Sequence, residues 1–159
     1  VAREVSIPIL RKDFINNRTQ LSESVDLGAS AVLLIAAMLQ KNQLFKLVEE
    51  AFKLGLEPLV EIHNETELAM VSELNSPLLG INNRKIVELE TDDGNVTTTE
   101  RLVGLVQPGT LIISESSLAG PEDVKRAIAA GTHAVLIGTA LLQAADMADM
   151  FRNLSEPIR

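Results

Sequence analysis

The sequence predicts an α/β fold in which short β-strands alternate with α-helices along the whole chain. Three observations support this. Short apolar runs rich in Val, Ile and Leu recur, and the stretches between them have the periodicity of amphipathic helices. The apolar runs are also continuous rather than alternating, as in parallel strands covered on both faces. The 159 residues match the size of one domain, and no linker marks a second, so we expect a single domain over residues 1–159.

Taken in order, the apolar runs predict six strands, at Ile7–Arg11, Ala31–Ala36, Leu59–Ile62, Leu78–Asn82, Leu111–Ser114 and Ala134–Ile137. Helices are predicted near Gln20–Leu27, Gln43–Leu54, Glu65–Leu74, Thr98–Val106 and Glu122–Ala130, and from Thr139 to about Asn153. Glycines stand where helices should hand over to strands, at Gly28, Gly55, Gly109 and Gly131. Pro121 suits the first turn of its helix.

Polar residues gather at the carboxyl ends of the predicted strands. In a TIM-type (β/α) barrel these ends form one rim that carries the active site, whereas a doubly wound sheet concentrates them at one switch point. Because the polar residues follow five different strands, a barrel-type fold is favoured. A closed barrel has eight strands, so six β/α units predict a partial barrel with open sheet edges.

Composition excludes several classes of function. A formal charge of −8 argues against a broad nucleic-acid surface. The absence of cysteine excludes disulfides, thiolate metal sites and thiol nucleophiles, and it fits a reducing cytoplasm. Apolar runs such as Ala31–Leu39 are too short to span a bilayer. We therefore expect a soluble, cytoplasmic protein.

Two charged residues follow apolar strands. Lys12 could act as a general acid or neutralise an anion at its strand exit, although a solvated loop lysine has the same appearance. Glu61 ends an apolar strand, where an unpaired buried charge is costly, and Lys12 is a plausible partner. Such a pair could be structural or functional. His63, with His133 distant in sequence, makes a poor metal site.

Three further strand exits carry hydrogen-bonding groups. Asn82 and Arg84 could donate to carboxylate, carbonyl or phosphate oxygens, whereas Asn83 is better explained as a turn residue. The last two exits, which carry Glu115, Ser116, Ser117, Gly138 and Thr139, resemble the places where barrels bind phosphate through backbone N–H groups and small hydroxyl residues. Helix capping is the structural alternative for the last pair.

Together these segments resemble the indole-3-glycerol-phosphate synthase family, lyases of tryptophan biosynthesis. The resemblance rests on Pro8–Ile15, Gly28–Ile35, Leu59–His63, Gly80–Arg84, Ser114–Ser116 and Val135–Gly138. Their order and spacing match the family's third to eighth β/α units. Nothing matches its first two strands, the first of which ordinarily carries an essential Glu and a Lys that binds the substrate carboxylate.

The resemblance implies a reaction and a set of roles. The family closes an indole ring on a carboxyphenylamino-deoxyribulose phosphate, losing carbon dioxide and water without cofactor or metal. Lys12 is similar to the family's general acid and Glu61 to the carboxylate that assists later proton transfers. Asn82, Arg84, Glu115 and Ser116 are similar to the family's other active-site polar groups. By the same resemblance, Phe14 and Leu34 would pack near the aromatic part of the substrate. The phosphate would be held by Ser117, Gly138 and Thr139.

Some positions depart from the family pattern. Ser117 stands where the family usually has Gly, Lys85 replaces an acid, and Ala36 with Ala37 enlarges the space after its strand. The acidic loop Asp92–Asn95 is expected to be solvated.

Two other readings remain open. The chain could be a catalytically incomplete or engineered partial barrel that retains phosphate binding and associates, with itself or a complementing segment, through its open edges. A different sugar-phosphate enzyme is opposed by the joint presence of Lys12–Phe14 and Gly80–Arg84.

Overall fold

A computed structural model describes residues 2–74, 78–84 and 95–158. The strands are β1 (Leu10–Arg11), β2 (Ala31–Ile35), β3 (Glu57–Ile62), β4 (Leu78–Asn82), β5 (Leu111–Glu115) and β6 (Ala134–Leu136). The helices are α1 (Arg18–Asp26), α2 (Lys41–Lys53), α3 (Glu65–Val71), α4 (Thr97–Leu102), α5 (Pro121–Ala130), α6 (Thr139–Leu142) and α7 (Met147–Ser155). Short 3-10 helices are η1 (Ala36–Met38), η3 (Val103–Leu105) and η4 (Glu156–Ile158).

The order of the strands distinguishes the two α/β architectures. The strands follow one another in the sheet as β1-β2-β3-β4-β5-β6, and the register shows parallel pairing of β1 with β2, β2 with β3, and β5 with β6. A doubly wound sheet reverses its strand order at a switch point, whereas a (β/α) barrel adds each strand beside the preceding one. The order of the strands therefore confirms the prediction of a barrel-type fold with six β/α units.

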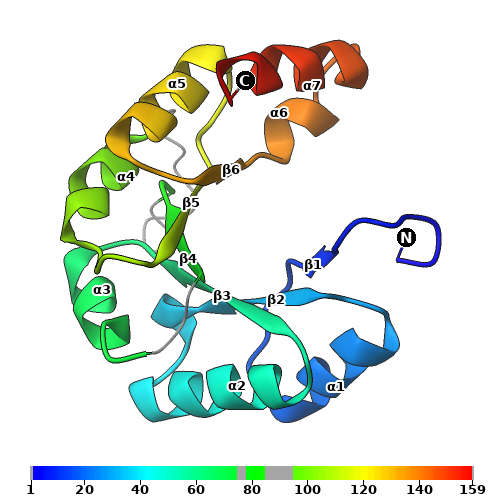
Figure 1. Cartoon of the computed structure of the whole chain (residues 1–159), viewed down its shortest axis with the longest axis vertical. Coiled ribbons are helices and arrows are strands. Elements are labelled where there is room, and N and C mark those ends of the chain that lie inside the picture. Colours follow the sequence, from blue (N-terminus) through cyan, green and yellow to red (C-terminus); the bar gives the residue numbers. More distant parts are fainter. Residues whose placement is uncertain (1, 75–77, 85–94, 159) are drawn as a thin grey trace. The chain divides into compact units, whose positions relative to one another are not determined.

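The chain divides into two compact units. Unit 1 comprises Val1–Ile62 and Thr66–Leu79, and β1, β2 and β3 lie within it. Figure 1 shows α1 and α2 side by side along the same side of these strands. Its buried core includes Leu21, Val32, Leu34, Leu44, Val48, Ala51, Val60 and Ile62. These residues come from both helices and both inner strands, so unit 1 has a continuous apolar core between its helices and strands.

Unit 2 comprises His63–Glu65 and Gly80–Arg159. One of its apolar clusters consists of the buried residues Val96, Leu118, Val124, Ala127 and Leu154, packed against Ile128, Val135, Ile137, Leu141 and Met150. This cluster joins α5, β6, α6 and α7. β2, β3 and β4 are almost wholly buried, as the continuous apolar runs predicted. β1 and β6, the outer strands of the sheet, are only half-buried, which the sequence pattern did not predict.

Local hydrogen bonds explain where two predicted elements differ. The single last helix predicted from Thr139 is instead two helices, because the Asp146 carboxylate caps a new helix by accepting from the Asp149 N–H at 2.9 Å. The first strand is shorter than predicted and contains only Leu10 and Arg11. Pro8 precedes it and cannot donate to a ladder, which restricts proline to strand margins.

The predicted glycine positions are confirmed at the ends of α1, α2 and α5, whereas Gly109 lies in a turn between η3 and β5. Gly28, Gly55, Gly109 and Gly131 all have positive φ. Gly131 ends α5 with φ 110° and leads into β6. Pro121 is the first residue of α5, as predicted. Glycine is favoured in such a conformation because a side chain there is strained.

We expect Gly131→Ala to destabilise the chain by about 1–2 kcal/mol, because alanine in the left-handed region clashes with its own backbone. Gly104→Ala is the matched control. Gly104 lacks a positive φ, and an added Cβ there would meet no heavy atom within 4 Å. Its substitution should change the free energy of unfolding, measured by urea titration, by less than about 0.5 kcal/mol. Equal losses in both variants would contradict a conformational role for Gly131.

Candidate active site

Lys12 and Glu61 form an ion pair in unit 1. Glu61 lies near the carboxyl end of β3, where its side chain is only 1% exposed, and Lys12 follows β1 with a side chain that is 46% exposed. The Lys12 Nζ donates to the Glu61 Oε2 at 3.3 Å. The predicted pairing is therefore confirmed. A buried carboxylate needs compensating charge and hydrogen bonds, and the half-exposed ammonium can supply both while still reaching a ligand.

The residues that flank Lys12 are anchored. Arg11 donates to the Gln20 carbonyl of α1 at 3.0 Å and to the Asp13 carboxylate at 3.0 Å. The Asp13 carboxylate also accepts from the Phe14 N–H, at 2.8 Å. This backbone hydrogen bond, and after it the Arg11 guanidinium, lowers the pKa of Asp13 below its ordinary value. The Phe14 side chain is 63% exposed, so its ring is available to an aromatic ligand.

The register of β2 determines which of its residues lie beside the ion pair. Ile35 pairs with Glu61, Leu34 with Val60 and Leu33 with Leu59. Since side chains alternate across a strand, Ile35 and Leu33 share the face of Glu61, and Leu34 lies on the opposite face, where it is fully buried. The β2 residue directly beside the ion pair is thus Ile35.

In unit 2, the ends of β4 and β6 are joined through Arg84. The buried Asn82 ends β4, and its Oδ1 accepts from the Arg84 N–H at 2.9 Å. The Arg84 guanidinium donates to the Thr139 hydroxyl at 3.2 Å. Thr139 follows Gly138 after β6. Three predicted site residues are therefore linked by hydrogen bonds, although Thr139 is far from the others in sequence.

Asn83 forms a buried hydrogen-bond network with the end of β5. Its Nδ2 lies 3.1 Å from the Ser114 Oγ, 3.0 Å from the Glu115 carbonyl and 3.2 Å from the Ser116 carbonyl. Its Oδ1 accepts from both the N–H and the hydroxyl of Thr99, each at 3.0 Å. The sequence indicated only a turn residue. The one available signal was a second amide at the end of a buried strand.

Two consecutive serines after β5 have left-handed backbone. Ser116 has φ 63° and Ser117 has φ 57°, and they are the non-glycine residues with positive φ in the described ranges. Glu115, directly before them, is buried. Gly138 has φ −118°, and a Cβ added there would meet no heavy atom within 4 Å. Gly138 is the N-cap residue of α6 and its carbonyl accepts from the Leu142 N–H at 3.0 Å, as the capping alternative predicted, but its φ does not require glycine. Lys85 and residues 92–94 of the acidic loop lie outside the described residues.

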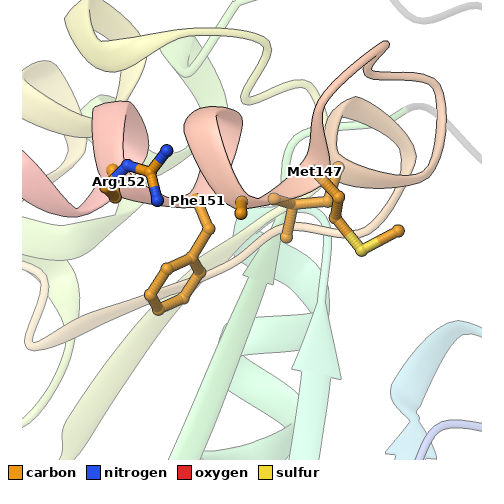
Figure 2. Close-up of a pocket in the computed structure, with 5 residues that line it drawn as sticks. Met147, Phe151 and Arg152 are labelled. Atoms are coloured by element: carbon orange, nitrogen blue, oxygen red, sulfur yellow. The ribbon is translucent and has the colours of Figure 1, made fainter.

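A separate apolar pocket of about 450 Å³ lies on α6 and α7. Its lining consists of Leu141, Met147, Ala148, Phe151 and Arg152. Figure 2 shows the Phe151 side chain projecting from the ribbon next to Arg152, and the Met147 side chain farther from Arg152. None of the predicted site residues lines it.

Two features of the described residues bear on ligands and membranes. They contain no group of three or more His, Asp or Glu side chains suited to hold a metal ion. No helix among them is both long and apolar enough to cross a bilayer.

Comparison with known proteins connects this geometry to a family. A family model described as indole-3-glycerol phosphate synthase matches residues 1–154. A protein of that name from Thermococcus kodakarensis is 46% identical over 156 residues, which cover 98% of this chain and 68% of the relative. Another from Pyrococcus furiosus is 43% identical, with 98% and 68% covered. A third, from Halalkalibacterium halodurans, is 41% identical, with 99% and 62% covered. The chain thus spans about two thirds of these relatives' length.

Solved structures support the fold. The 3-hexulose-6-phosphate synthase from Salmonella typhimurium superimposes with a TM-score of 0.77 at 17% identity, covering 95% of this chain and 72% of that one. Thiamine phosphate pyrophosphorylase from Pyrococcus furiosus gives a TM-score of 0.71 at 11% identity, with 99% and 70% covered. At such identities the likeness shows the TIM-barrel-type fold alone.

The family match extends over nearly the whole chain, and the relatives at 41–46% identity carry the same name. A degenerate or engineered module is not favoured by these matches. The chain belongs to the indole-3-glycerol phosphate synthase family of tryptophan-biosynthesis enzymes.

Proposed function

We propose that this chain carries the proton-transfer and phosphate-binding groups of a carboxy-lyase that closes an indole ring on carboxyphenylamino-deoxyribulose phosphate. The observation that supports this most strongly is the contact between the Lys12 ammonium and the buried Glu61 carboxylate, 3.3 Å apart, within motifs that resemble the family's. The reaction would use side chains alone, without cofactor or metal.

Lys12 is proposed as the general acid. Ring closure forms a carbon–carbon bond between the ring carbon that bears the carboxyl group and the substrate carbonyl carbon. The carbonyl oxygen then takes up a proton, which the ammonium can donate. Carbon dioxide leaves, and the electrons of its bond restore the aromatic ring. The half-exposed position of the Lys12 side chain suits contact with a bound substrate.

Glu61 is proposed to assist the dehydration. The hydroxyl formed from the carbonyl leaves as water, and a proton leaves the neighbouring carbon, which completes the indole. A carboxylate beside an ammonium can accept and return such protons. The hydrogen bond between the two groups would give such a proton a direct path from one to the other.

The remaining polar groups are proposed to bind the substrate. Asn82, Glu115 and Ser116 would contact the reacting part, Arg84 would bind an anionic group of the substrate, and Ser117, Gly138 and Thr139 would hold its phosphate. The hydrogen bond between Arg84 and Thr139 and the open space beside Gly138 support an anion site at these residues. For the aromatic part, Phe14 and Leu34 are proposed as contacts, and Leu33 and Ile35 lie on the face of β2 that Glu61 shares.

We further propose a cytoplasmic protein that acts as one partial-barrel domain and pairs its end strands with a second copy or a complementing segment. The half-buried β1 and β6 support such pairing, since sheet edges with open backbone groups favour association. A strictly monomeric mass in light scattering, unchanged by concentration, would contradict self-association.

Lys12→Ala and Glu61→Ala should each abolish indole formation, which indole fluorescence follows after the carboxyphenylamino-deoxyribulose phosphate is added to the purified chain. Lys125→Ala is the matched control, because Lys125 also pairs with a glutamate, Glu122, but on the exposed surface of α5. Its turnover should equal that of the unmodified chain. No product, together with saturable phosphate-dependent binding, would instead favour a binding module.

Stability measurements separate a catalytic role of the ion pair from a purely structural one. In a double-mutant cycle of Lys12→Met and Glu61→Gln, we expect a coupling of about 1 kcal/mol, small because the ammonium is half-exposed. The cycle of Lys125→Met and Glu122→Gln should give weaker coupling. If catalytic loss tracks the loss of unfolding free energy across all variants, the pair is structural rather than catalytic.

Gly138→Ala should weaken binding of inorganic phosphate roughly tenfold, because the added methyl group would occupy space proposed for the ligand. The free energy of unfolding should hardly change, since that Cβ meets no heavy atom within 4 Å. Gly104→Ala controls for the substitution itself, and calorimetry measures both. Unchanged phosphate affinity in Gly138→Ala would place the anion elsewhere.

A further inference from the structure

The left-handed turn at Ser116 and Ser117 needs an external restraint. A left-handed residue other than Gly, Asn or Asp costs roughly 1–2 kcal/mol, and here two occur in succession. Such a conformation persists only where surrounding contacts hold it. Both serines belong to the substrate-binding set proposed above, so whatever holds them also shapes that site.

Asn83 supplies contacts that hold this turn. Its backbone N–H donates to the Glu115 carbonyl at 2.9 Å, and its side-chain amide reaches the carbonyls of Glu115 and Ser116 at 3.0 and 3.2 Å. The first of these carbonyls immediately precedes the turn and the second lies inside it. Asn83 itself is buried at the end of β4.

The orientation of the Asn83 amide is determined by its other partners. Its Oδ1 accepts from the Thr99 N–H and hydroxyl, so exchanging the amide oxygen and nitrogen would set a donor against the Thr99 N–H. Nδ2 must therefore face Ser114, Glu115 and Ser116. Its two hydrogens serve three acceptors, so at least one hydrogen is shared between them.

We propose that Asn83 is a positioning residue that locks the Ser116–Ser117 turn in its left-handed form and thereby presets the backbone N–H groups there for the substrate phosphate. The phosphate part rests on the proposed function, whereas the lock itself does not. Without the two carbonyl contacts, the serines would relax to negative φ, and their N–H groups would turn away from the bound anion.

The test is Asn83→Asp in the full chain. Aspartate keeps the oxygen that accepts from Thr99 but replaces the donor that faces the turn. Residual dipolar couplings and backbone chemical shifts at Ser116 and Ser117 should lose their positive-φ signature. The affinity for inorganic phosphate should fall about tenfold, the loss expected when one orienting hydrogen bond is removed.

Thr99→Val is the matched control, because it removes a buried hydroxyl from the same network without touching the turn. The Thr99 hydroxyl donates to the Asn83 Oδ1 and lies 2.7 Å from the Ser114 Oγ. Thr99→Val should lower the urea midpoint yet retain the positive-φ signature and the phosphate affinity. If Asn83→Asp does not fold, Asn83→Ser, which is too short to reach both carbonyls, takes its place.

Glycine at positions 116 and 117 should rescue the phosphate affinity of the Asn83→Asp variant. In a chain with Ser116→Gly and Ser117→Gly the left-handed turn carries no side-chain strain, so Asn83→Asp should reduce phosphate affinity less than twofold. A structural defect elsewhere in the network would not be repaired by these glycines.

Retention of positive φ at both serines in Asn83→Asp would overturn the proposal. Loss of the signature with unchanged phosphate affinity would support the lock and contradict the phosphate role of Ser117.

Discussion

The alternation of side chains across parallel strands is the constraint on which both units depend. At the end of β1, successive side chains point to opposite faces of the sheet. Arg11 donates to α1, whereas its neighbour Lys12 reaches Glu61. A shift of one residue in register would exchange these two cations and leave the buried carboxylate without its ammonium. Register therefore determines the chemistry as well as the packing.

Much of the fold follows from local signals in the sequence. The bounds of β4, Leu78–Asn82, agree with the predicted strand because an apolar run ends sharply in polar residues. Pro121 marks the start of α5, because its fixed φ and missing N–H suit the first turn of a helix. Gly131 marks the end of α5, because glycine readily adopts the left-handed conformation found there. The pairing of Lys12 with Glu61 followed from the cost of burying a charge alone.

Other features depend on information that local patterns do not carry. The face on which Leu34 lies could not be predicted, because a continuous apolar strand gives no indication of which face a residue occupies. The network around Asn83 joins three separated segments, so no spacing predicts it. The break before α7 had a local signal, the capping Asp146, which the helical periodicity obscured.

The strained serines also bear on how this protein would respond to selection. Ser116 and Ser117 hold conformational free energy that glycine at the same positions would release. A screen for heat resistance alone would therefore favour substitutions at these two positions and remove hydroxyl groups that are proposed to contact the substrate. Stability and turnover would then be in conflict at this turn, while the apolar core could be improved without such a trade-off.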